Sequence, residues 1–159
     1  MPSSTSAARL PAHASVLRKG RVSEAGRAYL LTTVTEGRRP LFADFHVGRL
    51  LAAELRNEHA ARRVVSLAWV IMPDHLHWLL TLEQGALGQL MQRVKSRSAI
   101  AINARLGCTQ RLWQKGFHDH AVRGEEDLAS IARYVVANPL RAGLVSHIGD
   151  YPLWDADWL

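Results

Sequence analysis

Two histidines, His75 and His77, stand one residue apart in VIMPDHLHWLLTL (residues 70–82), a stretch with the composition of a buried strand. Residues i and i+2 of a strand project from the same face, so both imidazoles would lie together, with Leu76 and Trp78 on the opposite face. Neutral imidazoles presented from a rigid strand are frequent ligands of divalent metals. The pair therefore predicts half of a metal site, although two hydrogen-bonded surface histidines would show the same spacing.

A helix predicted over residues 125–137 supplies two further polar groups. At about 100° per residue, Tyr134 and Asn138 lie along one border of its apolar stripe. Residues i and i+4 are neighbours on a helix, so a tyrosine hydroxyl and an amide oxygen can project into one cleft at the edge of the sheet. Packing of Tyr134 and termination of the helix before Pro139 would explain the same residues without any chemistry.

The sequence FHDH repeats the i, i+2 spacing at His118 and His120. One of these histidines could complete a three-histidine site with His75 and His77. That arrangement would indicate a zinc hydrolase in which Tyr134 is merely structural.

The hydrophobic residues of the chain recur with the period of a strand in some segments and with the period of a helix in others. These segments predict the elements that position the candidate residues. Runs rich in β-branched and aromatic residues predict strands at 27–35, 62–72, 75–82 and 111–123, and the helical period predicts helices at 43–60, 87–106 and 125–137. Strand, helix, strand, strand, helix, strand is the order of the ferredoxin-like split β-α-β fold. We therefore expect an α+β sandwich, an antiparallel sheet with helices on one face, with the helix of Tyr134 appended at the C-terminal end.

Length and composition indicate one globular domain. The chain has 159 residues, of which 48% are hydrophobic and 21% charged, values typical of a single hydrophobic core. Residues 1–26, rich in Ser, Ala, Arg and Pro, predict a flexible basic arm before a single catalytic domain at 27–159. No segment has the length of a membrane span or the pattern of a secretory signal, so we expect no membrane association and a cytoplasmic location.

The charge of the chain favours an anionic partner. Twenty Lys and Arg residues against 14 Asp and Glu residues leave a formal net charge of +6. A basic balance of this size is typical of proteins that bind nucleic acid, although many basic proteins do not. The single cysteine, Cys108, excludes an intramolecular disulfide.

Four blocks of the chain, taken in order and spacing, closely resemble one family. They are VIMPDHLHWLL, LMQRVKSRSAIAIN, LWQKGFHDHAVR and IARYVVANPLRAGLV. Between about Lys19 and Tyr151 the chain is similar to the REP-associated tyrosine transposases, relatives of the insertion-sequence transposases in the single-tyrosine HUH class, where U is a hydrophobic residue. In this resemblance the segment from His75 to His77 matches the metal motif, Tyr134 the nucleophile and Asn138 the third metal ligand.

The resemblance implies a reaction and its requirements. A divalent cofactor, Mg²⁺ or Mn²⁺, would assist Tyr134 in cutting single-stranded DNA at a hairpin-forming repeat, through a 5′-phosphotyrosine intermediate and with no nucleotide cofactor. It also implies a monomer near the nucleoid, with a dimer as the alternative. A protein of the same fold that binds hairpins without cleaving them, and the three-histidine hydrolase, remain open.

Basic side chains are the expected phosphate contacts. The candidates are Arg38, Arg39, Arg93, Lys95, Arg97, Lys115 and Arg123, and the resemblance adds His118 and His120 as residues that shape the site or contact DNA. Each of them alone is also compatible with a solvated surface position. Trp113 could stack on a base or lie in the core, and the tail aromatics Tyr151, Trp154 and Trp158 are expected to dock on the domain and to cover part of the cleft.

Overall fold

The computed structural model describes residues 23–124 and 126–157. The predicted arm therefore lies outside the described residues, except for 23–26. These four residues lie against the domain: the Gly26 amide donates a hydrogen bond to the Leu82 carbonyl over 2.6 Å, and the Leu87 amide donates one to Ser23 Oγ over 3.0 Å. The folded domain thus includes residues 23–26 in addition to the predicted range.

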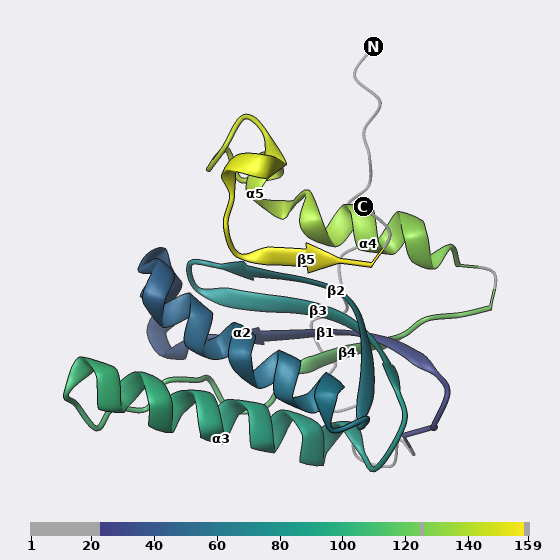
Figure 1. The fold of residues 1–159 in the computed structure, drawn as a ribbon, viewed down its shortest axis with the longest axis horizontal. Coiled ribbons are helices and arrows are strands. Elements are labelled where there is room, and N and C mark those ends of the chain that lie inside the picture. Colours follow the sequence, from purple (N-terminus) through teal and green to yellow (C-terminus); the bar gives the residue numbers. More distant parts are fainter. Residues whose placement is uncertain (1–22, 125, 158–159) are drawn as a thin grey trace.

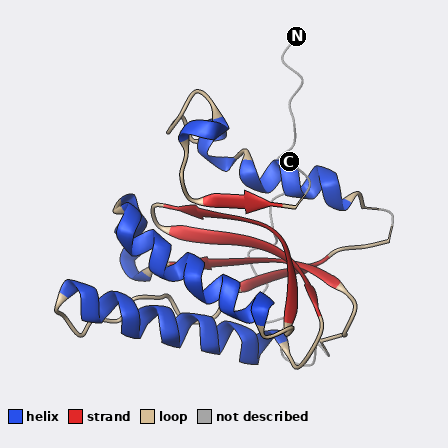
Figure 2. Ribbon diagram, in the orientation of Figure 1, coloured by secondary structure: helices blue, strands red, loops and turns tan. Residues whose placement is uncertain are grey.

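An antiparallel sheet forms the centre of the molecule (Figures 1 and 2). Its strands are β1 (Ala28–Val34), β2 (Val64–Met72), β3 (His75–Leu82), β4 (His118–Ala121) and β5 (Trp154–Ala156), in the order β4-β1-β3-β2-β5. The order and antiparallel sense of β1 to β4 are those of the ferredoxin-like fold. The predicted α+β class is confirmed.

Helices cover both faces of this sheet. α2 (Phe45–Ala60) and α3 (Leu87–Leu106) pack on one face, where they enclose the larger core around Leu31, Trp78 and Leu80. α4 (Leu128–Val136) lies against the other face, where Ala132, Val135 and Val136 meet apolar residues of β2 and β3, and the short α5 (Asn138–Arg141) follows it. In Figure 1 the sheet separates α4 from α2 and α3. The appended helix thus occupies the face that the split β-α-β unit leaves open.

Two aspartates determine where α2 and α4 begin. The Asp44 carboxylate accepts a hydrogen bond from the His46 amide over 2.9 Å, which makes Asp44 the N-cap of α2. The Asp127 carboxylate accepts one from the Ala129 amide over 3.0 Å. α4 therefore begins at Leu128, three residues after the predicted start.

A two-residue turn, Pro73 and Asp74, joins β2 to β3 and sets their register. Met72 lies opposite His75 in the resulting hairpin. Because paired residues share a face, this register places His75 and His77 on the side of the sheet that carries α4.

The predicted strand at 111–123 is wrong over most of its length. Only His118–Ala121 pairs with β1; upstream, Trp113 forms an isolated bridge with Thr35. The Lys95 ammonium donates to the Gln114 and Gly116 carbonyls, each over 2.7 Å. These carbonyls are satisfied by a side chain of α3, so this segment runs as a loop. Lys95 was itself a predicted phosphate contact.

The C-terminal tail adds β5 to the sheet, an element that the sequence did not predict. Trp154 lies opposite Val70, and the Tyr151 hydroxyl donates a hydrogen bond to the Ile71 carbonyl over 2.5 Å. The expected docking of Tyr151 and Trp154 is confirmed, whereas Trp158 lies outside the described residues. Among the described residues, no helix is both long and apolar enough to cross a membrane.

Candidate active site

His75 and His77 form a close pair on β3. Their ring centroids are 4.7 Å apart and the ring planes are inclined at 81°. The predicted alternation along the strand is confirmed, because Leu76 and Trp78 are completely buried on the opposite face. The two imidazoles are therefore available together on the α4 side.

Each imidazole of the pair is oriented through its Nδ1 atom. His75 Nδ1 lies 2.6 Å from the Asp74 carboxylate, and His77 Nδ1 lies 2.8 Å from the Thr32 hydroxyl. Asp74 in turn accepts a hydrogen bond from Arg38 over 3.2 Å. A bond at one ring nitrogen fixes the orientation of the other, so both Nε2 atoms remain for a ligand. The sequence analysis identified neither Thr32 nor Asp74 as a partner of the histidines.

Burial and nearby charges determine the protonation of His77 and Asp74. Burial, followed by the positive charges of His75 and Arg141, lowers the pKa of His77 from 6.5 to about 3. Burial alone would raise the pKa of Asp74, but the hydrogen bond from His75, with the charges of His75 and Arg38, holds it below its usual value. His77 is therefore neutral, and its lone pair free of a proton, at any physiological pH.

Tyr134 lies near the end of α4, with 47% of its surface exposed. The Arg141 guanidinium carbon lies 3.8 Å from the centroid of its ring, and Arg141 Nη2 donates a hydrogen bond to the Tyr134 carbonyl over 2.7 Å. Ala132, two residues before this position, and Val135, one residue after it, face the sheet. Tyr134 therefore occupies the solvent-facing border of the helix, as its place in the periodicity predicts.

The other two tyrosines have hydroxyls engaged inside the protein. Tyr29 is 4% exposed and its hydroxyl accepts a hydrogen bond from the Glu24 amide over 3.0 Å. The Tyr151 hydroxyl donates to the Ile71 carbonyl, and burial raises its pKa to about 12. Among the three tyrosines of the chain, Tyr134 is the one with an accessible phenol.

Asn138 begins α5, directly after the break that follows α4. Its Nδ2 atom donates a hydrogen bond to the Val135 carbonyl over 2.8 Å, which leaves Oδ1 as the remaining acceptor of the amide. Within the described residues, no hydrogen bond joins Tyr134 or Asn138 to either histidine. The Arg141 guanidinium stacks on the Tyr134 ring, and its positive charge also contributes to the lowered pKa of His77.

The second pair of histidines lies elsewhere on the same face. His118 is opposite Thr32, which is itself opposite His77, so a whole strand separates the two histidines. His120 Nε2 lies 3.1 Å from both carboxylate oxygens of Glu126. In the part of the chain that the structure describes, no three His, Cys, Asp or Glu side chains are close enough to hold one metal ion. This geometry argues against the three-histidine alternative.

Besides Arg38 and Lys95, two more of the predicted phosphate contacts have partners within the protein. Arg93 forms two hydrogen bonds of 3.0 Å with the carboxylate of Glu58, which is 2% exposed between α2 and α3. Arg39 donates to the Arg111 carbonyl over 2.6 Å and to the Gln110 side chain. These contacts give both arginines a structural role, and their predicted role in DNA binding stays a prediction.

The remaining basic candidates lie at the surface. Arg97, Lys115 and Arg123 are exposed. Lys115 lines a groove together with Thr32 and His118, next to the histidine pair. The predicted phosphate contacts thus fall into two groups: side chains that bond within the protein, and exposed side chains that are accessible to a phosphate.

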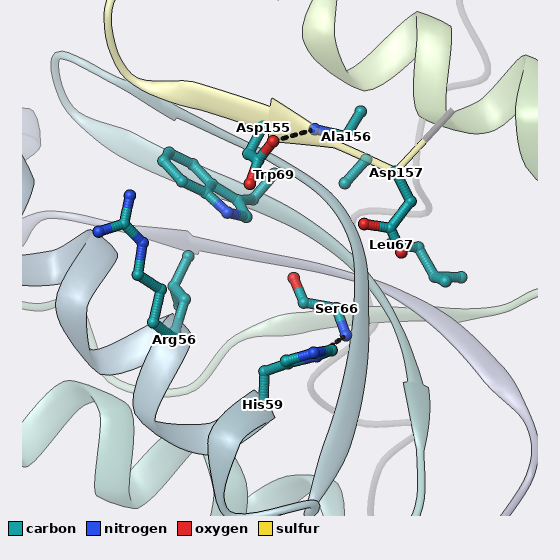
Figure 3. A pocket seen from close by; sticks show the side chains of 10 residues that line it. Arg56, His59, Ser66, Leu67, Trp69, Asp155, Ala156 and Asp157 are labelled. Atoms are coloured by element: carbon teal, nitrogen blue, oxygen red, sulfur yellow. Dashed lines mark hydrogen bonds between the residues drawn. The ribbon is translucent and has the colours of Figure 1, made fainter. Parts of the chain in front are cut away.

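Two other features are separate from the histidine pair. Trp113 is 5% exposed and donates a hydrogen bond to Ser98 Oγ over 3.1 Å, so it is a core residue. A hollow between α2 and β5, in which the Ser66 amide bonds to His59 (Figure 3), lies on the α2 side of the sheet. The described residues that line it include none of the predicted site residues.

Two solved structures that share this fold are described as transposases, one of them provisionally. One, a REP-associated tyrosine transposase bound to a REP hairpin, superposes with a TM-score of 0.69 at 24% identity over 84% of this chain and 79% of that chain. Another, provisionally named a transposase, from Deinococcus radiodurans, superposes with a TM-score of 0.53 at 24% identity over 74% of this chain and 95% of that one. At this identity the likeness establishes the fold.

The sequence comparisons establish the family. The family described as "Transposase IS200 like" matches residues 26–138, a range that includes both histidines, Tyr134 and Asn138. The chain therefore belongs to the IS200-like transposase family, as the resemblance predicted.

Two proteins are similar to this chain in sequence over part of their length. The REP-associated tyrosine transposase of Escherichia coli (strain K12) is 29% identical over 87 residues, 54% of this chain. A Haemophilus influenzae protein, provisionally given the same name, is 24% identical over 139 residues, 80% of this chain and 78% of its own length. The match covers only half of the E. coli protein.

Proposed function

We propose that the chain is a metal-dependent endonuclease and strand transferase that cuts single-stranded DNA beside a hairpin through Tyr134. The observation that carries this proposal is the pair of imidazoles held through their Nδ1 atoms, with both Nε2 atoms free on the face that carries α4. An exposed phenol near the end of α4 is the matching nucleophile. The solved relative bound to a REP hairpin supports a hairpin of repeat DNA as the substrate.

The donor atoms of the site suit a divalent ion. His75 and His77 would contribute Nε2, and the free Oδ1 of Asn138 would be a third ligand. A bound Mg²⁺ or Mn²⁺ supplies charge that polarises a phosphate oxygen. Two imidazoles favour Mn²⁺ over Mg²⁺, because affinity at nitrogen ligands is greater for transition metals.

The protein residues carry out a transesterification. The Tyr134 hydroxyl attacks the phosphorus and loses its proton to solvent, a bond forms between Tyr134 Oη and phosphorus, and the bond from phosphorus to the 3′ oxygen breaks. The departing oxygen takes up a proton, so the products are a 5′-phosphotyrosine and a free 3′-hydroxyl. The number of phosphoester bonds is conserved, so rejoining needs no nucleotide cofactor. The resemblance further implies action on chromosomal DNA in the cytoplasm, by a monomer or, as the alternative, a dimer.

The test is formation of a covalent adduct. The purified chain is incubated with a labelled single-stranded hairpin oligonucleotide and Mn²⁺, and products are separated under denaturing conditions. We expect the wild type to form an adduct and Tyr134→Phe to form none. Binding of the hairpin should not depend on Tyr134. Tyr151→Phe is the matched control, because its hydroxyl bonds to the Ile71 carbonyl, and it should retain the adduct.

Other outcomes would identify the alternatives. An adduct that persists in Tyr134→Phe would remove this residue from the role. Cleavage without an adduct would favour a hydrolase. Tight hairpin binding with neither adduct nor cleavage in Mn²⁺ or Mg²⁺ would favour a protein that only binds hairpins.

A further inference from the structure

Arg141 is placed beside Tyr134 by the break between the last two helices. α4 ends at Val136, and α5 begins at Asn138 with Pro139 in its first turn. This arrangement brings Arg141 back over a residue seven positions earlier. Its Nη2 atom donates to the Tyr134 carbonyl over 2.7 Å, and its guanidinium carbon lies 3.8 Å from the centroid of the ring.

These two contacts constrain the aromatic ring of Tyr134. The hydrogen bond holds the guanidinium against the backbone of α4, and the stacked cation restricts the ring at an otherwise exposed position. An exposed tyrosine without such a contact is free to change rotamer on a nanosecond timescale. Arg141 therefore orders the phenol before any substrate is bound.

The same guanidinium has further hydrogen-bond donors. It carries five N–H groups in a planar fork, and the described contacts to Tyr134 use one of them. Arg141 is exposed at the surface, and its charge is also felt by His77. The cation therefore lies against the phenol, and a phosphate that Tyr134 attacks must be bound within reach of it.

We propose that Arg141 is a substrate-binding residue that both positions the Tyr134 ring and donates hydrogen bonds to the phosphate that this tyrosine attacks. The inference rests on the proposed function and adds a residue to it. In the transesterification, negative charge accumulates on the non-bridging oxygens as the new bond to Tyr134 Oη forms and the bond to the 3′ oxygen breaks. A planar fork can bind such oxygens in pairs, whereas a lysine ammonium acts as a point charge and stacks poorly.

The test compares Arg141→Ala and Arg141→Lys with Arg133→Ala. Arg133 is a matched control because it is exposed on the same helix, one residue before Tyr134. Single-turnover adduct formation is measured at saturating hairpin, and hairpin affinity is measured separately in the Tyr134→Phe background. We expect Arg141→Ala to slow adduct formation by about 100-fold and to weaken hairpin binding by about 3- to 10-fold. Arg141→Lys should recover only part of the rate, and Arg133→Ala should stay within about twofold of the wild-type rate.

A second measurement does not depend on activity. The ring carbons of the three tyrosines are labelled and observed by NMR in the free protein, with the unfolding midpoint of each variant as a check on folding. We expect the Tyr134 signals to shift in folded Arg141→Ala and to be unchanged in Arg133→Ala. Unchanged Tyr134 signals in Arg141→Ala would overturn the positioning role.

The two proposals fail in different ways. If the wild type forms an adduct and Arg141→Ala forms it at the same rate, the inference about Arg141 is wrong and the proposed function stands. If the wild type forms no adduct, the proposed function fails. The hairpin affinity of Arg141→Ala then decides the phosphate contact, and an unchanged affinity would overturn it.

Discussion

Each imidazole of the site uses one ring nitrogen for a bond inside the protein, which makes the two flanking residues as important as the histidines. Asp74 holds His75 and Thr32 holds His77. Partners of this kind fix the tautomer and orientation of a metal-binding histidine. The affinity for a metal should therefore depend on residues that never contact it.

Replacing Thr32 with valine tests this dependence. The substitution keeps the shape of the side chain but removes the hydroxyl that lies 2.8 Å from His77 Nδ1. We expect Mn²⁺ affinity to fall by about 10- to 100-fold, measured by isothermal titration calorimetry. An affinity equal to that of the wild type would show that Thr32 does not orient the ring.

Thr33 supplies the matched control. It is buried on the face of the sheet that carries α2 and α3, where Leu76 is its neighbour on β3. Its hydroxyl has no hydrogen-bond partner among the described residues. Thr33→Val should leave Mn²⁺ affinity unchanged. It should also raise the free energy of unfolding by about 1 kcal/mol, because a buried unpaired hydroxyl is destabilising, and denaturant titration measures this change.

The low pKa of His77 has a consequence for stability in acid. Its pKa is about 3 in the folded chain and near 6.5 when unfolded, so only the unfolded state gains this proton between these values. Its contribution is fully retained above pH 6.5 and is lost as the pH falls toward 3, at about 1.4 kcal/mol per pH unit. In chelator, the free energy of unfolding of His77→Gln should fall less steeply over this range; equal slopes would contradict the assignment.

At the scale of elements, α2 and α3 are joined by a buried ion pair. Glu58 is 2% exposed and accepts two hydrogen bonds from Arg93, with Arg63 at 3.4 Å as a further partner. Both helices support the face of the sheet opposite the histidines. This ion pair stabilises the packing of α2 and α3 and takes no part in the proposed chemistry.

Replacement of Arg93 separates its two roles. Arg93→Ala leaves the Glu58 carboxylate buried without its main partner, so we expect the free energy of unfolding to fall by about 3 kcal/mol. Arg97→Ala, on the same helix but exposed, should change it by less than about 0.5 kcal/mol. A stable Arg93→Ala protein with weakened hairpin binding would instead support the predicted phosphate contact.

At the scale of the whole molecule, the main hydrophobic core and the proposed active site lie on opposite faces of the sheet. One face is closed by α2 and α3 over the large core, and α4 lies on the other (Figure 1). The register of β1, β2 and β3 places the histidine pair and Thr32 on the α4 side. The tail adds β5 beside β2, where Tyr151 and Trp154 pack near Val135 of α4. The rigid sheet and the docked tail therefore support the helix that carries the proposed nucleophile.

The net charge of +6 leads to a prediction about salt. Hairpin affinity should fall steeply with increasing salt, because each phosphate contact releases counterions. Lys115→Ala should reduce the slope of log affinity against log salt by about 1. Arg93→Ala, whose charge is neutralised by Glu58, should leave the slope unchanged in protein that remains folded, and equal effects of the two variants would contradict this division.

The sequence by itself determined most of the helices and strands and the face of β3 on which the histidines lie. Strand alternation places His75 and His77 together because the period of two is a local property of the backbone, and Asp44 caps α2 for an equally local reason. The family, and with it the candidate nucleophile, followed from four blocks of residues. Local periodicity could not reveal β5, since three residues that pair only with a distant edge strand carry too little pattern.

Only the tertiary structure decided which residues surround the site. Thr32 lies 45 positions from His77, and Arg141 reaches Tyr134 only because the chain breaks between α4 and α5. The structure likewise separated Arg93, held by Glu58, from the exposed Arg97. Side-chain types are written in the chain, but the partner of each side chain depends on register and packing between segments that lie far apart in the sequence.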